Sequence, residues 1–448
     1  MKIIKPIAAA ALSTSVAAFF LSANAWAAIP IQHWTQTSGA QVFLVESPSI
    51  PMLDVQIDFD AGGRRDPATQ AGLADVTALM AGKGVAAQAG QPALDENQLG
   101  EAWADLGASF GASAGADRMS FGLRTLTDPA LLPRVTDLAA RQLGQPAWPE
   151  DVWRRERERL DAAIAESRTR PGTIAALAFD QAVYGEHPYG WETTPESLAR
   201  IHIADMKAYY AQHVQPCRAR VSVVGAVGRA QADALVAELL ARLPQPSTCA
   251  PLPAVPEVAP LAGPREIRIP FKSAQAHVLI GQPGYKRSDP DFFALLVGNH
   301  ILGGGGFTSR LMSQVREQRG LSYSVYSAFS PGLHAGAFTI GLQTRPDQAD
   351  QAVRVARQVL ADFVADGPTP DELKDAKDNL IGGFALRLDS NRKLLGNVAN
   401  IAWNHLPLDY LDHWSERVAA VTAGEIKAAF RRVLQPDRMV TVIVGAAP

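Results

Sequence analysis

The sequence has 448 residues, of which 47% are hydrophobic and 19% are charged. This length allows about two to four globular domains, and the balance excludes disordered, collagen-like and coiled-coil proteins. The formal net charge is −3, so nothing in the composition attracts nucleic acid or an acidic membrane surface. Two cysteines are too few for a disulfide scaffold.

Residues 1–27 have the pattern of a secretory signal peptide. Lys2 and Lys5 give a basic start, and an apolar, Ala-rich run extends from Ile7 to Leu21. The letters ANAWA then offer two A-x-A cleavage choices. A membrane anchor would need roughly 20 apolar residues, and this run is shorter. We therefore expect export, most naturally to a bacterial periplasm, without membrane insertion after cleavage.

The two cysteines leave two alternatives open. In an oxidising compartment Cys217 and Cys249 could form a disulfide, because their spacing allows it. Two free buried thiols fit the sequence equally well.

The chain repeats itself with a period of about 220 residues. Ala204–Ala226 and Gly424–Ala446 share eight identities at that offset. Each reads as an amphipathic helix, a Q-P-x-R turn and a β-branched strand that ends at Gly. Ser120–Thr125 and Thr339–Thr344 match within one residue of the same offset, and each precedes a long predicted helix. The period is too long for a solenoid and indicates duplicated halves.

We predict an N-terminal domain at 28–243, a linker at 244–263 with six prolines, and a C-terminal domain at 264–448. Strands such as Leu53–Phe59 and His277–Gly281 alternate with helices of a dozen residues or more. The pattern favours an α+β fold of two similar domains, each a mainly antiparallel sheet with helices packed on one face. A cleft between the halves is the expected binding site.

Two segments carry motifs. Residues 61–85 read AGGRRDPATQAGLADVTALMAGKGV, and residues 302–327 read LGGGGFTSRLMSQVREQRGLSYSVYS. Together they resemble the N-terminal and C-terminal signatures of the pitrilysin/insulinase family of zinc peptidases. The resemblance extends over nearly all of the chain after residue 27. Members of that family carry H-x-x-E-H on the first segment, where two His bind zinc and the Glu activates water.

The metal motif is degenerate in this chain. The resemblance places Asp75 at the first His, Ala78 at the Glu and Leu79 at the second His. The family's further ligand would fall at Ala165, with Glu166 adjacent, on a predicted helix at 149–167. A zinc site needs about three protein ligands, so we expect no zinc on this chain and no catalytic residue of its own.

The C-terminal signature is intact. Arg316 and Tyr323 match the pair with which family members bind substrate across the cleft from zinc. We expect Arg316 late on a short helix and Tyr323 on the strand after a turn at Gly320. Both side chains donate hydrogen bonds, which suits a peptide carbonyl and its developing oxyanion. A helix-terminal cation and a core aromatic are the structural alternatives.

The glycine run before this pair consists of Gly303, Gly304, Gly305 and Gly306. The resemblance implies a flexible, substrate-contacting loop at the cleft mouth, since glycine lets a backbone approach a ligand closely. A tight turn between two helices is an equal alternative. The spacing does not match a phosphate-binding loop.

These features predict the zinc-less, Arg/Tyr-bearing subunit of a periplasmic heterodimeric metallopeptidase. It resembles bacterial processing-peptidase-like heterodimers, in which a homologous partner supplies H-x-x-E-H and zinc. This subunit would bind the peptide substrate and be inactive alone. The alternative is a non-catalytic scaffold or peptide-binding protein of the same fold. No Cys/His pair and no carboxylate dyad stands out in the sequence for a different hydrolase.

Overall fold

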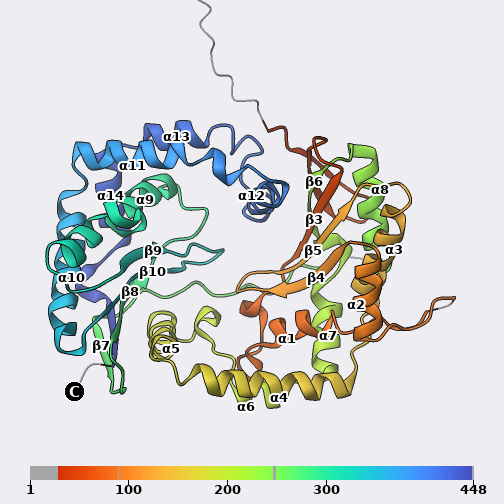
Figure 1. The fold of residues 1–448 in the computed structure, drawn as a ribbon, viewed down its shortest axis with the longest axis horizontal. Helices are drawn as coiled ribbons and strands as arrows, with labels where there is room; N and C mark the ends of the chain where they lie inside the picture. Colours follow the sequence, from red (N-terminus) through yellow and green to blue (C-terminus); the bar gives the residue numbers. More distant parts are fainter. Residues whose placement is uncertain (1–28, 89, 246–248, 446–448) are drawn as a thin grey trace, which may run out of the picture.

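The computed structural model describes residues 29–88, 90–245 and 249–445. The predicted signal peptide at 1–27 lies outside the described residues. Among the residues described, no helix combines the length and apolar character that crossing a bilayer requires. Figure 1 shows two sheets facing each other, each backed by helices. We call residues 29–243 the N-terminal half and residues 264–445 the C-terminal half.

The N-terminal half contains one six-stranded sheet with the order β1-β2-β6-β3-β5-β4. Neighbouring strands are antiparallel except β2 and β6, which are parallel. The strands are β1 (Gln32–Thr35), β2 (Gln41–Glu46), β3 (Met52–Phe59), β4 (Ser109–Ala114), β5 (Met119–Leu126) and β6 (Arg220–Gly225).

The C-terminal half repeats this arrangement without the first strand. Its order is β7-β11-β8-β10-β9, and only β7 and β11 are parallel. The strands are β7 (Arg265–Ile269), β8 (Ala276–Pro283), β9 (Val325–Phe329), β10 (Ala337–Thr344) and β11 (Val440–Val444). The predicted α+β architecture of two similar, mainly antiparallel sheets is therefore confirmed.

Each half contributes its own set of helices. Those of the N-terminal half are α1 (Leu73–Met80), α2 (Glu96–Asp105), α3 (Leu132–Gly144), α4 (Glu150–Ser167), α5 (Pro171–Tyr184), α6 (Pro195–Ala199), α7 (Ile203–His213) and α8 (Arg229–Leu240). Those of the C-terminal half are α9 (Phe292–Asn299), α10 (Ala349–Asp366), α11 (Pro370–Gly382), α12 (Asn391–Trp403), α13 (Trp414–Ala420) and α14 (Ala423–Val433).

The two halves exchange one helix each. Helix α5 packs on strands β8 and β11 of the C-terminal sheet, and α12 packs on β3 and β6 of the N-terminal sheet. The helices begin at residues 171 and 391, which is the repeat offset of 220. Each sheet thus has its own helices on one face. The exchanged helix lies on the other, which we call the inner face.

The two exchanged helices meet different surfaces. Ala175, Phe179 and Val183 of α5 share one apolar cluster with the valines of β11. Strand β3, on which α12 packs, instead alternates apolar and polar residues. Its apolar residues lie in the core of the N-terminal half and are Leu53, Val55, Ile57 and Phe59. Because side chains alternate across a strand, the intervening Asp54, Gln56 and Asp58 face α12.

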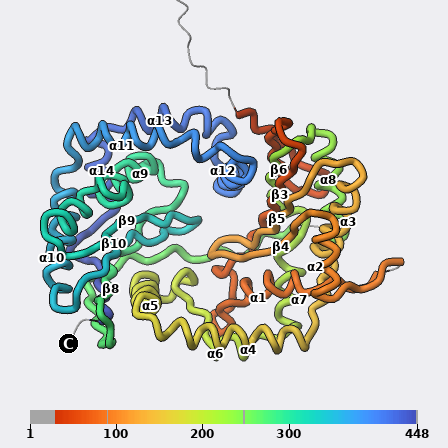
Figure 2. The backbone as a smooth tube through the Cα atoms, in the orientation of Figure 1, coloured from red at the N-terminus to blue at the C-terminus, as the bar shows by residue number. Residues whose placement is uncertain are grey.

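The linker follows the N-terminal half before it enters the C-terminal half. Its described residues lie outside helices and strands. Figure 2 shows the green backbone after α8 crossing from one half to the other. Cys217 and Cys249 form a disulfide, which decides between the two alternatives that the sequence left open. The disulfide ties the start of the linker to the segment before β6. Arg65 and Arg218 donate hydrogen bonds to the linker carbonyls of Pro253 and Ala250.

Candidate functional site

The degenerate metal motif lies on α1. This helix begins after Gly72, whose φ of 98° suits glycine, and the Asp66 carboxylate accepts hydrogen bonds from the backbone N–H groups of Gly72 and Ala74. Asp75 reaches solvent, although the surrounding protein displaces part of its water and so raises the pKa of its carboxyl. Ala78 is buried in the core.

The helix that resembles the family's source of a further ligand is α4. Glu166 there pairs with Arg170 one turn later, at 2.5 Å, and both side chains are exposed. Across the described ranges, no group of three or more His, Cys, Asp or Glu side chains could hold a metal ion. The residues of α1 and α4 thus do not fit zinc, because neither Ala78 nor Leu79 has a ligand atom in its side chain.

Arg316 and Tyr323 lie together. The guanidinium carbon of Arg316 is 4.9 Å from the centre of the Tyr323 ring and 4.8 Å from that of Phe307. Both rings are largely exposed, at 79% for Tyr323 and 66% for Phe307. Cation–π attraction holds a guanidinium over such rings while its N–H groups stay free. The two aromatic rings therefore position Arg316 without using its hydrogen-bond donors.

The charge of Arg316 is not neutralised within the described chain. No carboxylate or hydrogen-bond acceptor contacts its guanidinium there, whereas nearby Arg310 is paired with Glu372 at 2.5 Å. A partly exposed guanidinium without an internal acceptor keeps its N–H groups available to water or to a ligand.

Local backbone geometry sets this arrangement. Arg316 lies near the end of a π-helical segment, Met312–Glu317, as the predicted short helix required. Such segments are rare and recur at functional sites. The predicted strand position of Tyr323 is wrong, because β9 begins only at Val325. The Ser322 hydroxyl contacts the backbone carbonyls of Ser324 and Gln343. These contacts keep the residues just before Val325 out of the strand ladder of β9.

The glycine run forms a turn between two helical segments. His300–Gly304 continues α9 as a π-helix, and Gly306–Thr308 forms one 3₁₀ turn. A Cβ on Gly303 would lie 2.4 Å from the Ser327 backbone nitrogen, so this glycine permits close packing on β9. Gly304 and Gly306 are exposed, while Gly305 is half-buried. The run brings Phe307 over Arg316.

Tyr323 also borders a cavity of about 700 Å³. The cavity lies between α5 and the inner face of β8, β9 and β10, so both halves of the chain line it. Its size is in the range of known ligand sites.

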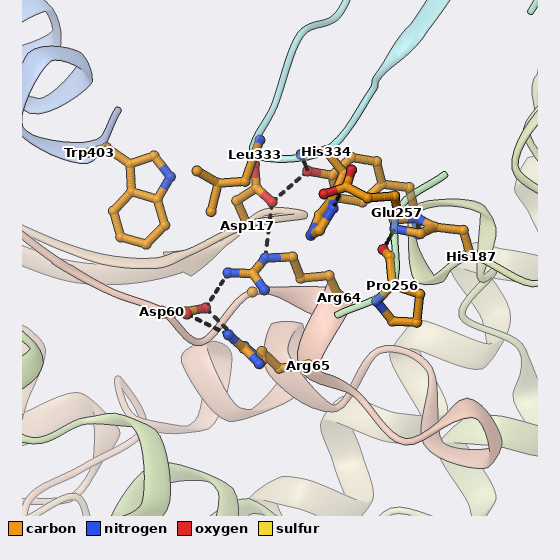
Figure 3. A network of polar contacts seen from close by, with 12 residues as sticks. Asp60, Arg64, Arg65, Asp117, His187, Pro256, Glu257, Leu333, His334 and Trp403 are labelled. Atoms are coloured by element: carbon orange, nitrogen blue, oxygen red, sulfur yellow. Dashed lines mark hydrogen bonds and ion pairs between the residues drawn. The ribbon is translucent and has the colours of Figure 1, made fainter. Parts of the chain in front are cut away.

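A polar network joins the halves beside this region (Figure 3). Asp117 forms an ion pair with Arg64 at 3.1 Å and accepts hydrogen bonds from the Tyr189 hydroxyl and the Leu333 backbone N–H. His187 contacts the Pro256 carbonyl at 3.0 Å. The linker and both halves are therefore fixed to one another at this point.

The fold and the site define a duplicated α+β protein. Its helix α1 has no metal ligands at the positions of the degenerate motif, and its Arg316 and Tyr323 side chains lie together. A family model described as the peptidase M16 inactive domain matches residues 200–380. A peptidase M16 inactive domain from Pseudomonas fluorescens is 33% identical; the similarity covers 93% of this chain and 98% of that one, with a TM-score of 0.87. The chain therefore belongs to the peptidase M16 family, the pitrilysin/insulinase family that its motifs resemble.

Two curated relatives carry contrasting names. An uncharacterized zinc protease of Streptomyces coelicolor is 29% identical over 70% of this chain and 69% of its own length. A non-peptidase homolog, YmxG, of Helicobacter pylori is 26% identical over 86% of this chain and 87% of its own. This chain is thus similar both to proteins named as proteases and to one named as a non-peptidase.

Sequence reasoning missed Phe307 and the contribution of α5 to the cavity. The available signal for Phe307 was an aromatic residue directly after a glycine run, because an apolar ring there has no predicted core to enter. No sequence signal places α5 on the sheet of the other half.

Proposed function

We propose that this chain is the zinc-less subunit of an exported heterodimeric metallopeptidase. It binds peptide and completes the active cleft of a homologous partner that carries H-x-x-E-H and zinc. The observation that carries the proposal is the Arg316–Tyr323 pair: the guanidinium is held by two aromatic rings and has no acceptor within the described chain. The donors of this partly exposed pair are therefore available to a ligand.

Within the complex, Arg316 and Tyr323 act on the peptide group to be cleaved. The guanidinium and the phenol hydroxyl donate hydrogen bonds to the substrate carbonyl oxygen. As that oxygen becomes an oxyanion, both hydrogen bonds strengthen. The partner supplies the zinc that activates water. Gly304 and Gly306, which are exposed, let the backbone of the glycine run approach the substrate.

The test combines the purified chain with an H-x-x-E-H homologue encoded nearby. We expect no peptidase activity from the chain alone and activity from the mixture. Arg316→Ala and Tyr323→Phe should lower kcat about 100-fold and at least 10-fold respectively, as for lost oxyanion donors, with the zinc content of the complex unchanged. Arg319→Ala is the matched control, because Arg319 is exposed and bonds only to Gln314.

Two results contradict this proposal. Peptidase activity of the isolated chain that survives Asp75→Ala rejects a subunit role. Unchanged kinetics of both Arg316→Ala and Tyr323→Phe reject the role assigned to the pair.

A non-catalytic peptide-binding or scaffold protein is the second candidate. The similarity to the non-peptidase homolog of Helicobacter pylori favours it. Under this function the chain binds peptides without a zinc-bearing partner, and no mixture with a homologue gains activity.

A further inference from the structure

Two histidines lie in the polar network that joins the halves, and the proposed function uses neither of them. His187 follows α5 in the N-terminal half, and His334 lies between β9 and β10 in the C-terminal half. Both are buried, and their ring centres are 5.1 Å apart. His187 Nε2 lies 3.0 Å from the Pro256 carbonyl oxygen of the linker. His334 Nδ1 lies 3.2 Å from a carboxylate oxygen of Glu257, the next linker residue (Figure 3). We call these four residues the linker junction.

The contacts of His187 determine which of its ring nitrogens carries a proton. The backbone N–H of Tyr189 donates to Nδ1 at 3.1 Å, so Nδ1 carries none. Nε2 therefore carries the proton and donates to the Pro256 carbonyl. A second proton can bind only at Nδ1, where it would point at the Tyr189 N–H. Protonation thus breaks this contact and displaces the turn Pro188–Gly190.

The surroundings of the linker junction also oppose a positive charge on His187. The other titratable and charged groups there are Arg64, Asp117, Tyr184, Tyr189, Glu257, Lys286 and His334. Glu257 is already paired with Lys286 at 2.6 Å. Asp117 is already paired with Arg64 at 3.1 Å. Burial of the ring and the neighbouring second histidine lower the pKa of His187, and burial keeps both tyrosines neutral by raising their pKa.

Movement of Tyr189 would reach the other half of the chain directly. Its hydroxyl accepts a hydrogen bond from the His334 backbone N–H at 3.2 Å. The fit is close, because a Cβ on Gly332 would lie 2.6 Å from the same hydroxyl oxygen. Both residues belong to the connection between β9 and β10, and these two strands line the cavity that Tyr323 borders. A change at His187 is thereby transmitted to a wall of the cavity.

We propose that His187 is a pH-sensitive latch, which holds the linker junction closed in neutral solution and releases it in mildly acidic solution. The inference is independent of the proposed peptidase function. In the released form the ring reaches water, where an imidazole has a pKa of about 6.5. Below that pH the released form binds one proton more than the closed form, so the ratio of released to closed molecules rises by up to about 10-fold per pH unit. Above it neither form gains a proton, and the junction stays closed.

The experiment measures amide hydrogen exchange of the full chain by mass spectrometry at pH 7.5 and pH 5.5. Each rate is divided by the rate of the same segment in the unfolded chain at that pH, which removes the chemical pH dependence of exchange. We expect the normalised exchange of residues 185–191 and 253–258 to rise about 5- to 10-fold at pH 5.5. His187→Gln should abolish this rise, because an amide can donate to the Pro256 carbonyl but does not titrate. His33→Gln is the control, since His33 is exposed on β1 and stacks on Phe43.

Three results overturn the latch. The first is normalised exchange that is the same at both pH values in the unmodified chain. The second is a rise of equal size in His187→Gln. The third is a parallel rise in the core strands β3 and β8, which would mean global unfolding. If His187→Gln exchanges rapidly at both pH values, the NMR titration of the His187 ring in the unmodified chain decides: its midpoint must coincide with the rise in exchange, and a midpoint elsewhere rejects the proposal.

Discussion

The backbone N–H of Leu333 donates a hydrogen bond to the Asp117 carboxylate at 3.0 Å, which joins the β9–β10 connection of one half to the β4–β5 connection of the other. The other carboxylate oxygen contacts the Tyr189 hydroxyl at 2.6 Å and Arg64 at 3.1 Å. One side chain thus ties the two halves together (Figure 3).

Asp117→Ala should lower the free energy of unfolding by roughly 2–3 kcal/mol. It leaves the buried Arg64 with only Asp60 as its ionic partner and removes acceptors from Tyr189 and Leu333. Chemical denaturation measures this change. Asp105→Ala is the control, because Asp105 is exposed at the end of α2 and its removal should change stability by less than about 0.5 kcal/mol. Equal stability of the two variants would show that the network does not hold the halves together.

Reduction of the Cys217–Cys249 disulfide should destabilise the protein by about 3–4 kcal/mol. The bond closes a loop with a sequence separation of 32 residues, and opening it returns that loop's entropy to the unfolded chain. Thermal unfolding with and without dithiothreitol measures the effect. The double variant Cys217→Ser, Cys249→Ser should be less stable than the oxidised protein and insensitive to the reductant. A reductant effect of the same size in that variant would contradict the assignment.

Gly303→Ala should disturb the Arg316 site by moving β9. The added Cβ would lie 2.4 Å from the Ser327 nitrogen, so the helix and the strand must separate, at a cost of about 2 kcal/mol or more. The separation also strains the hydrogen bonds between Asn299 and Ser327. Gly396→Ala in α12, where a Cβ meets open space, should instead stabilise the protein by up to about 1 kcal/mol. If both variants melt alike, the packing role of Gly303 is wrong.

The sequence predicted much of the fold because the relevant signals are local. Alternation in Leu53–Phe59 and helical periodicity in 149–167 identify β3 and α4, which the structure places at Met52–Phe59 and Glu150–Ser167. The repeat offset predicted two similar halves, and the strand orders of the two sheets agree. The predicted strand position of Tyr323 was wrong because the Ser322 hydroxyl contacts the backbone carbonyls of Ser324 and Gln343. A longer β9 would have used these carbonyls in its ladder.

By itself the sequence determined that the chain is duplicated, that Asp75, Ala78 and Leu79 cannot form a zinc centre, and that the Arg316 and Tyr323 signature is intact. Each of these follows from residue chemistry at fixed spacing. Only the tertiary structure decided that α5 and α12 change partners and that Phe307 completes the aromatic support of Arg316. These relationships depend on how whole elements pack against one another. A local sequence pattern does not encode that packing.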